Sequence, residues 1–418
     1  MIAVVRRAER LEGEVRLPGD KSISHRALIL AALADGWSRI HDMSAGADVQ
    51  STASCLRALG AEIEETAVRG FGLDGVRKAK GPLDCGNSGT TMRLLAGVLA
   101  AQGFVSELTG DESLVRRPMD RIVKPLTMMG AHAQWPPLRV GGKGPLHGIE
   151  YQPPTPSAQV KSALLLAGLF AEGTTVVIEP VGTRNHTELM LRAMGADVRS
   201  EGDRVEIDKT DKLEPIDIEV PGDLSAASFW MVAAGLVPGS TLHLPGVGFN
   251  PTRSAFVELL RESGFDIQAV RERTSGGEPV ADLEIRTASE THPFEVEGAA
   301  AAQMIDELLV LAVAATQVAG VSHIAGAAEL HVKESDRIAA MAVGLAAMGA
   351  DITALDDGWT VKGPTNLRGA RVSSFGDHRV AMALAVAGLL ADGETEIEGA
   401  DCVEISYPDF FEQLESLC

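Results

Sequence analysis

Six stretches of the chain are apolar on nearly every side, and a short polar cluster precedes each of them. Helices without a polar stripe are buried instead of lying on a surface, so the pattern predicts six buried helices. A glycine follows each stretch and is expected to form a left-handed C-terminal cap. The predicted helices span residues 24–34, 86–101, 158–171, 225–237, 306–318 and 378–391, and the glycines are Gly36, Gly103, Gly173, Gly239, Gly320 and Gly393.

A short strand and a second, amphipathic helix follow each buried helix. Strands such as residues 204–207 alternate polar and apolar positions, so one face of each sheet should meet solvent. The unit recurs roughly every 65 to 85 residues, which is too long for a thin solenoid but fits a small α/β unit. We therefore expect helices inside and sheets outside. Five of the second helices should end at Gly60, Gly130, Gly195, Gly264 and Gly349.

The sixth unit is incomplete, because its second helix, expected over residues 408–417, has no strand after it. Residues 3–17 are strand-like and should supply the missing strand, so that both termini share one domain. The chain would then cross twice between two halves. We expect one domain of residues 20–222 with units one to three and another of residues 1–19 plus 223–418 with units four to six.

Composition narrows the classes of function. The 418 residues suit two domains. A net charge of -21 argues against nucleic acid or an anionic membrane as partner. No apolar run approaches a membrane span, and no cationic leader with an apolar region opens the chain. The four cysteines show neither metal spacing nor a disulfide framework, which favours a reducing cytoplasm; they are Cys55, Cys85, Cys402 and Cys418.

In so acidic a chain, basic clusters at helix starts are informative, because helix N-termini attract phosphate and carboxylate. Residues 17–26 place Lys21, Ser22 and Arg26 around the first helix start, although Ser22 could simply be an N-cap. Residues 85–93 form a glycine-containing turn into the second helix, and an ordinary cap is the simpler interpretation. Neither segment is a dinucleotide or P-loop motif.

A group of three arginines lies beside Pro118, which is expected to be the first residue of a helix. Arg116, Arg117 and Arg121 form either a carboxylate clamp or a solvated helix start.

The third helix carries a further polar cluster at its start. Ser157, Gln159 and Lys161 could bind a ligand or form a surface cap, and Arg184 precedes the next helix.

Acidic residues enter at the fifth apolar helix. Asp306 and Glu307 open it, so that one could be a general base and the other a cap. Lys333, Glu334 and Arg337 would share one helical face, as a site or as a surface salt-bridge ladder.

Asp377, His378 and Arg379 open the last apolar helix. An arginine is seldom buried unpaired, so Arg379 should face solvent or an anion. Taken together, these clusters predict a cationic cleft for small anions between the two halves.

The motifs occur in an order that resembles one family. LPGDKSISHRALILAAL, GNSGTTMRLLAG, SLVRRPM, SAQVKSALLLAGL, TRNHTE, PGDLSAASF, VKESDRI and GDHRVAMA are similar to those of the 5-enolpyruvylshikimate-3-phosphate synthase (3-phosphoshikimate 1-carboxyvinyltransferase) family, and the SAQ and TRNH variants resemble its second bacterial class. The resemblance implies an inside-out α/β barrel of two domains, the enolpyruvyl transferase fold, with six βαβαββ units. It also implies transfer of the enolpyruvyl group of phosphoenolpyruvate to the 5-hydroxyl of shikimate 3-phosphate, in the shikimate pathway to chorismate and aromatic amino acids.

Residue roles follow from the resemblance, motif by motif. The proton acceptor would be Asp306, while Glu334 and Lys21 would manage protonation of the methylene carbon. The residues implied for shikimate 3-phosphate are Lys21, Ser22, Arg26, Ser157, Ala158, Gln159, Arg184, Asp306 and Lys333. The residues implied for phosphoenolpyruvate are Lys21, Gly89, Arg117, Gln159, Arg337 and Arg379. The resemblance implies no metal and no organic cofactor, and we expect a cytoplasmic monomer.

Two positions depart from the family pattern. Asp306 stands in Ile-Asp-Glu-Leu-Leu, where the second class is closer to Asp-Glu-Ile/Tyr-Pro. Ser406 stands before Tyr407 and Pro408, where some members place a lysine that binds phosphoenolpyruvate. Gly89 is kept, and alanine there is associated in the family with glyphosate tolerance, so we expect glyphosate to bind.

Other functions stay open at this point. UDP-N-acetylglucosamine enolpyruvyl transferase shares the fold, but its typical members use a loop cysteine, and residues 116–119 contain none. The negative charge and the missing nucleotidylated-histidine context disfavour an RNA 3′-phosphate cyclase. A non-enzymatic repeat scaffold or a ring around nucleic acid would need neither Asp306 nor Glu334.

Overall fold

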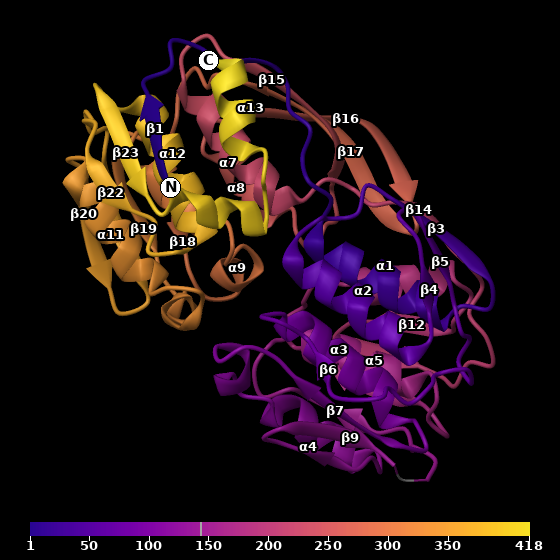
Figure 1. The fold of residues 1–418 in the computed structure, drawn as a ribbon. Coiled ribbons are helices and arrows are strands. Elements are labelled where there is room, and N and C mark those ends of the chain that lie inside the picture. Colours follow the sequence, from indigo (N-terminus) through magenta and orange to yellow (C-terminus); the bar gives the residue numbers. More distant parts are fainter. Residues whose placement is uncertain (143) are drawn as a thin grey trace. The chain divides into compact units, whose positions relative to one another are not determined.

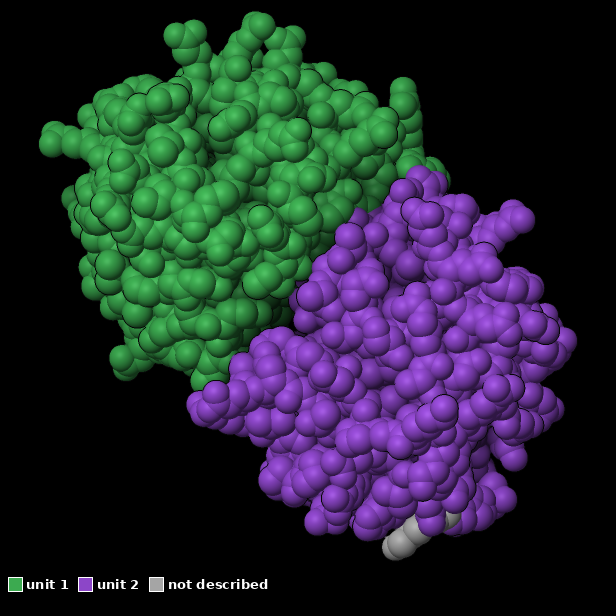
Figure 2. Space-filling view, viewed as in Figure 1, with its two compact units in different colours: residues 1–18, 222–273, 279–418 green, residues 19–221, 274–278 purple. Residues whose placement is uncertain are grey.

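The computed structural model describes residues 1–142 and 144–418, which divide into two compact units (Figures 1 and 2). The first unit comprises Met1–Pro18, Gly222–Arg273 and Pro279–Cys418, and the second comprises Gly19–Pro221 and Thr274–Glu278. The unit boundaries near residues 18 and 221 lie one residue from those expected from the sequence. The short segment Thr274–Glu278 was not foreseen in the second unit.

The strands of the second unit form three sheets in the described residues. Their orders are β14-β3-β5-β4, β6-β7-β9-β8 and β10-β11-β13-β12. In each sheet the first two strands are parallel and the other neighbours antiparallel. The strands are β3 (Trp37–His41), β4 (Glu62–Ile63), β5 (Ala67–Arg69), β6 (Leu83–Asp84), β7 (Val105–Thr109), β8 (Ala133–Gln134), β9 (Leu138–Gly141), β10 (Glu150–Tyr151), β11 (Thr175–Ile178), β12 (Val198–Glu201), β13 (Arg204–Ile207) and β14 (Asp217–Glu219).

The helices of the second unit alternate with these strands. One buried helix and one amphipathic helix belong to each sheet, as the repeat predicts. They are α1 (Lys21–Leu33), α2 (Ala47–Leu59), α3 (Gly89–Ala100), α4 (Asp120–Met128), α5 (Ala158–Gly168) and α6 (His186–Ala193), with a short 3-10 helix η1 (Leu114–Arg116) before α4.

The first unit repeats this arrangement. Its sheets have the orders β16-β17-β15-β2, β18-β19-β21-β20 and β1-β23-β22. The strands are β1 (Ile2–Arg6), β2 (Glu12–Glu14), β15 (Thr241–Gly248), β16 (Asp266–Ser275), β17 (Glu278–Arg286), β18 (Glu295–Val296), β19 (Gly320–Ile324), β20 (Asp351–Leu355), β21 (Gly358–Gly363), β22 (Arg371–Ser373) and β23 (Glu394–Glu398). The helices are α7 (Leu224–Leu236), α8 (Ala255–Glu262), α9 (Gly298–Gln303), α10 (Leu308–Ala315), α11 (Arg337–Ala347), α12 (His378–Leu390) and α13 (Phe410–Leu417), with 3-10 helices η2 (Ala328–Val332) and η3 (Ala400–Ile405).

The apolar helices form the core of each unit, which confirms the prediction of helices inside and sheets outside. Almost every side chain of α3, α7, α10 and α12 is buried. Small residues allow close packing: a Cβ atom added to Gly97 of α3 would lie 2.2 Å from the carbonyl oxygen of Ala163 in α5. Backbone contact at that distance tolerates only glycine.

The N-terminal strand completes the sixth unit, as predicted. Strand β1 pairs antiparallel with β23, and β22 pairs parallel with β23. Val5 of β1 is 1 % exposed and packs against α12, where a Cβ on Gly388 would lie 3.1 Å from the Val5 side chain. Both termini therefore belong to the first unit.

Helix ends differ from the prediction in several places. Helices α1, α7 and α12 end in extended caps at Ala34, Val237 and Ala391, and the glycines follow later in the chain. Gly103 does not adopt a positive φ, in contrast to its five counterparts. The second helices end at or just before the expected glycines, and all five of these glycines have a positive φ; they are Gly60, Gly130, Gly195, Gly264 and Gly349.

The segment between β16 and β17 packs within the second unit. Ser275 Oγ accepts a hydrogen bond from the Glu219 backbone N–H at 3.0 Å and donates to its carbonyl at 2.8 Å. Glu278 Oε1 lies 2.9 Å from His186 Nδ1, and both side chains are buried. These long-range contacts have no short-range sequence signal.

Candidate active site

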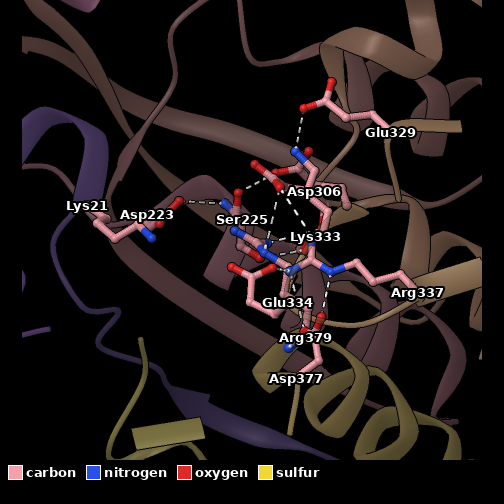
Figure 3. Close-up of polar contacts among 12 residues, drawn as sticks. Lys21, Asp223, Ser225, Asp306, Glu329, Lys333, Glu334, Arg337, Asp377 and Arg379 are labelled. Atoms are coloured by element: carbon pink, nitrogen blue, oxygen red, sulfur yellow. Dashed lines mark hydrogen bonds and ion pairs between the residues drawn. The ribbon is translucent and has the colours of Figure 1, made fainter. Parts of the chain in front are cut away.

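Asp306 lies at the centre of a charged cluster in the first unit (Figure 3). Its Oδ1 atom is 3.7 Å from Arg337 Nη1 and 3.8 Å from Arg379 Nε. Arg379 Nη1 also donates a hydrogen bond to the Asp306 carbonyl oxygen at 3.1 Å. The sequence predicted that Asp306 and Glu307 open the helix, but α10 begins at Leu308, with Glu307 as its N-cap residue. The carboxylate of Asp306 thus projects from the segment that leads into α10.

The Arg337 side chain is 2 % exposed and is held by acidic partners on two segments. Its Nε donates to Asp377 Oδ2 at 2.8 Å, and its Nη2 donates to Glu334 Oε2 at 2.7 Å. Asp377 also caps α12, because its Oδ1 accepts the Arg379 N–H at 2.9 Å. One buried carboxylate therefore contacts two of the three arginines expected to hold phosphoenolpyruvate, Arg337 through its side chain and Arg379 through its backbone.

The electrostatics of this cluster favour charged carboxylates and a neutral histidine. Burial alone would raise the pKa of Glu334, but the Arg337 guanidinium holds that pKa below its ordinary value. Burial would also raise the pKa of Asp377, but the neighbouring Arg337 guanidinium acts against burial, and the pKa of Asp377 is lowered. Burial, reinforced by Arg379, lowers the pKa of His378 to about 3. Glu334 and Asp377 are thus anions at neutral pH, whereas His378 is uncharged.

Lys333 and Arg337 do not share one helix, which corrects the sequence interpretation. Lys333 follows the 3-10 helix η2, and Arg337 is the first residue of α11. Lys333 Nζ donates to Glu329 Oε1 at 2.9 Å. Glu334 lies in the turn between the two helices and is half-exposed. The turn still brings Glu334 within hydrogen-bond distance of Arg337, although the two residues do not share a helix.

In the second unit, Lys21 and Ser22 occupy the first turn of α1. The N-cap of α1 is Asp20, which accepts the Ile23 N–H at 2.9 Å, so the interpretation of Ser22 as the cap is wrong. Lys21 Nζ lies 3.1 Å from Asp48 Oδ2 and keeps a side chain that is 36 % exposed. Its ammonium group is therefore accessible from solvent.

Arg26 is buried deeper in α1 and is held by three hydrogen bonds. Its Nε donates to Thr187 Oγ1 at 2.8 Å, and its Nη2 donates to Ser162 Oγ at 2.8 Å. Its Nη1 donates to the Ser22 carbonyl at 2.9 Å. Burial lowers the pKa of Arg26 to about 10, while the Glu188 carboxylate acts in the opposite direction. The guanidinium therefore stays charged at neutral pH and fixed in orientation.

The start of α3 brings together a glycine, an amide and two arginines. Ser88 caps α3 and Gly89 is its first residue. A Cβ atom on Gly89 would lie 3.0 Å from Arg93 Nη1 and 3.5 Å from Arg117 Nη1. Gln159 Oε1 accepts from Arg93 Nη1 at 2.5 Å. Arg93, which was given no role, thus lies beside Gly89 and donates to Gln159, two of the residues predicted for phosphoenolpyruvate.

The remaining predicted residues of the second unit stand at helix starts. Ser157 caps α5 and Ala158 is its first residue. Arg184 precedes Asn185, which stands at the N-cap position of α6. Lys161 is 1 % exposed and is not part of a surface cap, because its Nζ lies 2.6 Å from Glu179 and 2.7 Å from Glu188.

The arginine-rich loop differs from the prediction in its helix start. Helix α4 begins at Asp120, two residues after Pro118, with Met119 at the cap position. Arg117 Nη2 donates to Asn87 Oδ1 at 2.6 Å, which ties the loop to the turn before α3.

No metal or membrane feature is found among the described residues. They contain no cluster of three or more His, Cys, Asp or Glu side chains arranged to bind a metal ion. Within residues 1–142 and 144–418, no helix combines the length and apolar character needed to cross a bilayer. All four cysteines are unpaired thiols.

Comparison with known proteins decides the family. The model of the family EPSP synthase (3-phosphoshikimate 1-carboxyvinyltransferase) matches residues 5–414. The chain belongs to the EPSP synthase family. A 3-phosphoshikimate 1-carboxyvinyltransferase of Syntrophomonas wolfei is 50 % identical over 418 residues, covering 97 % of each chain. One from Gloeobacter violaceus is 51 % identical over 420 residues, covering 97 % of this chain and 96 % of the relative.

A solved structure of the EPSP synthase from Acinetobacter baumannii superposes with a TM-score of 0.92 at 40 % identity. It covers all of this chain and 98 % of that one. The family, the enolpyruvyl transferase fold and the enzyme class expected from the sequence are thereby confirmed. The chain is a transferase of the shikimate pathway.

Several residues that shape the site escaped the sequence interpretation. Arg93, Asp48 and Asn87 contact predicted residues in the second unit. In the first unit, Arg253 contacts Glu307. Only Arg93 carried a usable signal, because it stands four residues after Gly89 on one helical face.

Proposed function

We propose that residues of both units act on one pair of substrates, shikimate 3-phosphate and phosphoenolpyruvate. The 5-hydroxyl oxygen of shikimate 3-phosphate would bond to C2 of phosphoenolpyruvate, while its proton passes to Asp306. The methylene carbon would gain a proton from Lys21 or Glu334 and lose one again as phosphate leaves. The products are 5-enolpyruvylshikimate 3-phosphate and inorganic phosphate, and no redox step is involved.

The observation that carries the proposal is the pairing of Asp306 with two arginines in the first unit. Its Oδ1 lies 3.7 and 3.8 Å from Arg337 and Arg379, beyond direct hydrogen-bond distance of either. Nearby cations interact favourably with the charged form of a carboxylate, and only that form can accept a proton. Preorganised cations also stabilise negative charge that develops on transferred groups.

The binding roles divide between the substrates. Phosphoenolpyruvate would be held by Gly89, Arg117, Gln159, Arg337 and Arg379, together with Lys21. Shikimate 3-phosphate would be held by Lys21, Ser22, Arg26, Ser157, Ala158, Gln159, Arg184, Asp306 and Lys333. Basic groups at the helix starts of a chain with a net charge of -21 support a role in binding small anions. The proposal includes a cytoplasmic monomer without a nucleic-acid or membrane partner.

Single variants test these roles. Phosphate release from phosphoenolpyruvate, with saturating shikimate 3-phosphate, should fall at least about a hundredfold in Asp306→Asn and in Glu334→Gln, since general acid–base groups contribute about 10²–10⁴-fold. Arg117→Lys should mainly raise the KM for phosphoenolpyruvate, because lysine cannot form a bidentate contact. Glu258→Gln, an exposed change in the same unit as Asp306, is the control. Full activity of Asp306→Asn would refute the proposed proton acceptor.

A further inference from the structure

Glu307, the residue after Asp306, turns away from the helix that it precedes. It occupies the N-cap position of α10, yet its side chain makes no capping hydrogen bond. The side chain is 1 % exposed, and its Oε1 accepts from Ser225 Oγ at 2.5 Å and from Arg253 Nη2 at 3.2 Å. The Glu307 carboxylate therefore does not cap α10, and its hydrogen bonds go to Ser225 and Arg253 instead.

The three side chains form a closed ring of hydrogen bonds. Arg253 Nη2 also donates to Ser225 Oγ at 2.7 Å, so the hydroxyl accepts from the arginine and donates to the glutamate. The Arg253 side chain is 4 % exposed, and its Nη2 lies 3.7 Å from Asp223 Oδ1. Because the charges are buried and hydrogen-bonded, the ring resists rearrangement.

The ring fixes one end of the peptide that carries Asp306. Ser225 belongs to the first turn of α7, and Arg253 precedes α8, so Glu307 ties the start of α10 to two other segments. On the other side, Arg379 Nη1 holds the Asp306 carbonyl oxygen. Figure 3 shows Ser225, Asp306 and Arg379 in this cluster. The two consecutive carboxylates thus have different partners. Glu307 contacts Arg253. Asp306 lies beside Arg337 and Arg379.

We propose that Glu307, through Arg253 and Ser225, is a positioning residue that fixes the carboxylate of Asp306 for proton acceptance. The inference rests on the proposed function of Asp306. This role also explains why two acidic residues are adjacent in the chain, because Asp306 would accept the proton and Glu307 would keep Asp306 in place. A displacement of about 1 Å in a reacting group can lower a rate about a hundredfold.

A double-mutant cycle separates positioning from simple stabilisation. The turnover number is measured for wild type, Glu307→Ala, Asp306→Asn and the double variant, each under saturating substrates and below its melting temperature. We expect Glu307→Ala to lower kcat about thirtyfold, with both KM values within threefold of wild type. The kcat of the double variant should be no lower than that of Asp306→Asn alone, because the effects of mutating residues that act as one unit do not add.

Conservative variants keep the test decisive if Glu307→Ala folds poorly. Glu307→Gln retains the Oε1 acceptor and should recover most of kcat. Ser225→Ala removes two of the three hydrogen bonds of the ring and should lower kcat in the same direction as Glu307→Ala. Glu258→Ala, an exposed change, should leave kcat unchanged.

The two failures are distinguishable. If Asp306→Asn is inactive but Glu307→Ala keeps wild-type kcat, or if the two losses multiply, the positioning role is wrong and the proposed function stands. If Asp306→Asn keeps wild-type kcat, the proposed function of Asp306 itself falls.

Discussion

Removal of the Asp377 carboxylate should destabilise the first unit far more than loss of a helix cap. Asp377 is fully buried, caps α12 through the Arg379 N–H and accepts from Arg337 Nε at 2.8 Å. Loss of one partner of a buried ion pair costs about 3–5 kcal/mol, and loss of an N-cap costs about 1 kcal/mol. Because Glu334 still contacts Arg337, we take the lower end of the first range, about 3 kcal/mol. With about 1 kcal/mol for the lost cap, we expect Asp377→Ala to cost about 4 kcal/mol.

A second aspartate supplies the matched control. Asp336 caps α11 by accepting the Ala339 N–H at 3.1 Å, but its side chain is 47 % exposed. Asp336→Ala should therefore cost only about 1 kcal/mol. Asp377→Asn keeps a cap acceptor and loses the charge, so it should fall between the two.

The assay is urea denaturation of the full chain at pH 7.5, followed by circular dichroism. A difference of about 3 kcal/mol between Asp377→Ala and Asp336→Ala is the expected result. Equal losses of about 1 kcal/mol in both variants would refute the reasoning, because the Arg337–Asp377 pair would then add nothing beyond a cap.

Three further predictions concern acid stability, inhibition and the N-terminal strand. His378 is neutral when folded, with a pKa of about 3 against 6.5 when unfolded, so acid favours unfolding below pH 6.5. Between pH 7.5 and 5 the free energy of unfolding, measured in urea, should fall about 2 kcal/mol less in His378→Gln than in wild type; equal falls would contradict this. Glyphosate should inhibit competitively with phosphoenolpyruvate, and Gly89→Ala, whose Cβ would approach Arg93 at 3.0 Å, should raise both the inhibition constant and the KM for phosphoenolpyruvate about tenfold. No inhibition of wild type at millimolar glyphosate would exclude binding. Deletion of residues 2–6 removes the strand that pairs with β23 and the buried Val5 side chain. It should lower the melting temperature by about 4 °C or more in a thermal scan. An unchanged melting temperature would mean that β1 adds no stability.

The architecture could be predicted because it depends on local patterns of hydrophobic residues. All-round apolar stretches specified the buried helices, and the incomplete sixth unit indicated that β1 would return to pair with β23. The polar cluster before the last apolar helix predicted where Arg379 would lie in α12, whereas Asp306 lies just before α10 instead of opening it.

The contacts that orient these residues could not be predicted in the same way. Arg253 and Glu307 are 54 residues apart, and Arg93 and Gln159 are 66 apart, so their hydrogen bonds depend on how whole helices pack. The segment around Glu334 looked helical because its charges have helical spacing, but it is a turn between η2 and α11. Charge spacing alone does not separate a helix from a turn that joins two helices.

Phosphate release from phosphoenolpyruvate tests the central claim most directly. Wild-type protein would be assayed with phosphoenolpyruvate alone, with added shikimate 3-phosphate, and with UDP-N-acetylglucosamine in its place. The account predicts release only when shikimate 3-phosphate is present. Release that depends on UDP-N-acetylglucosamine instead, or no release with either acceptor, would contradict it.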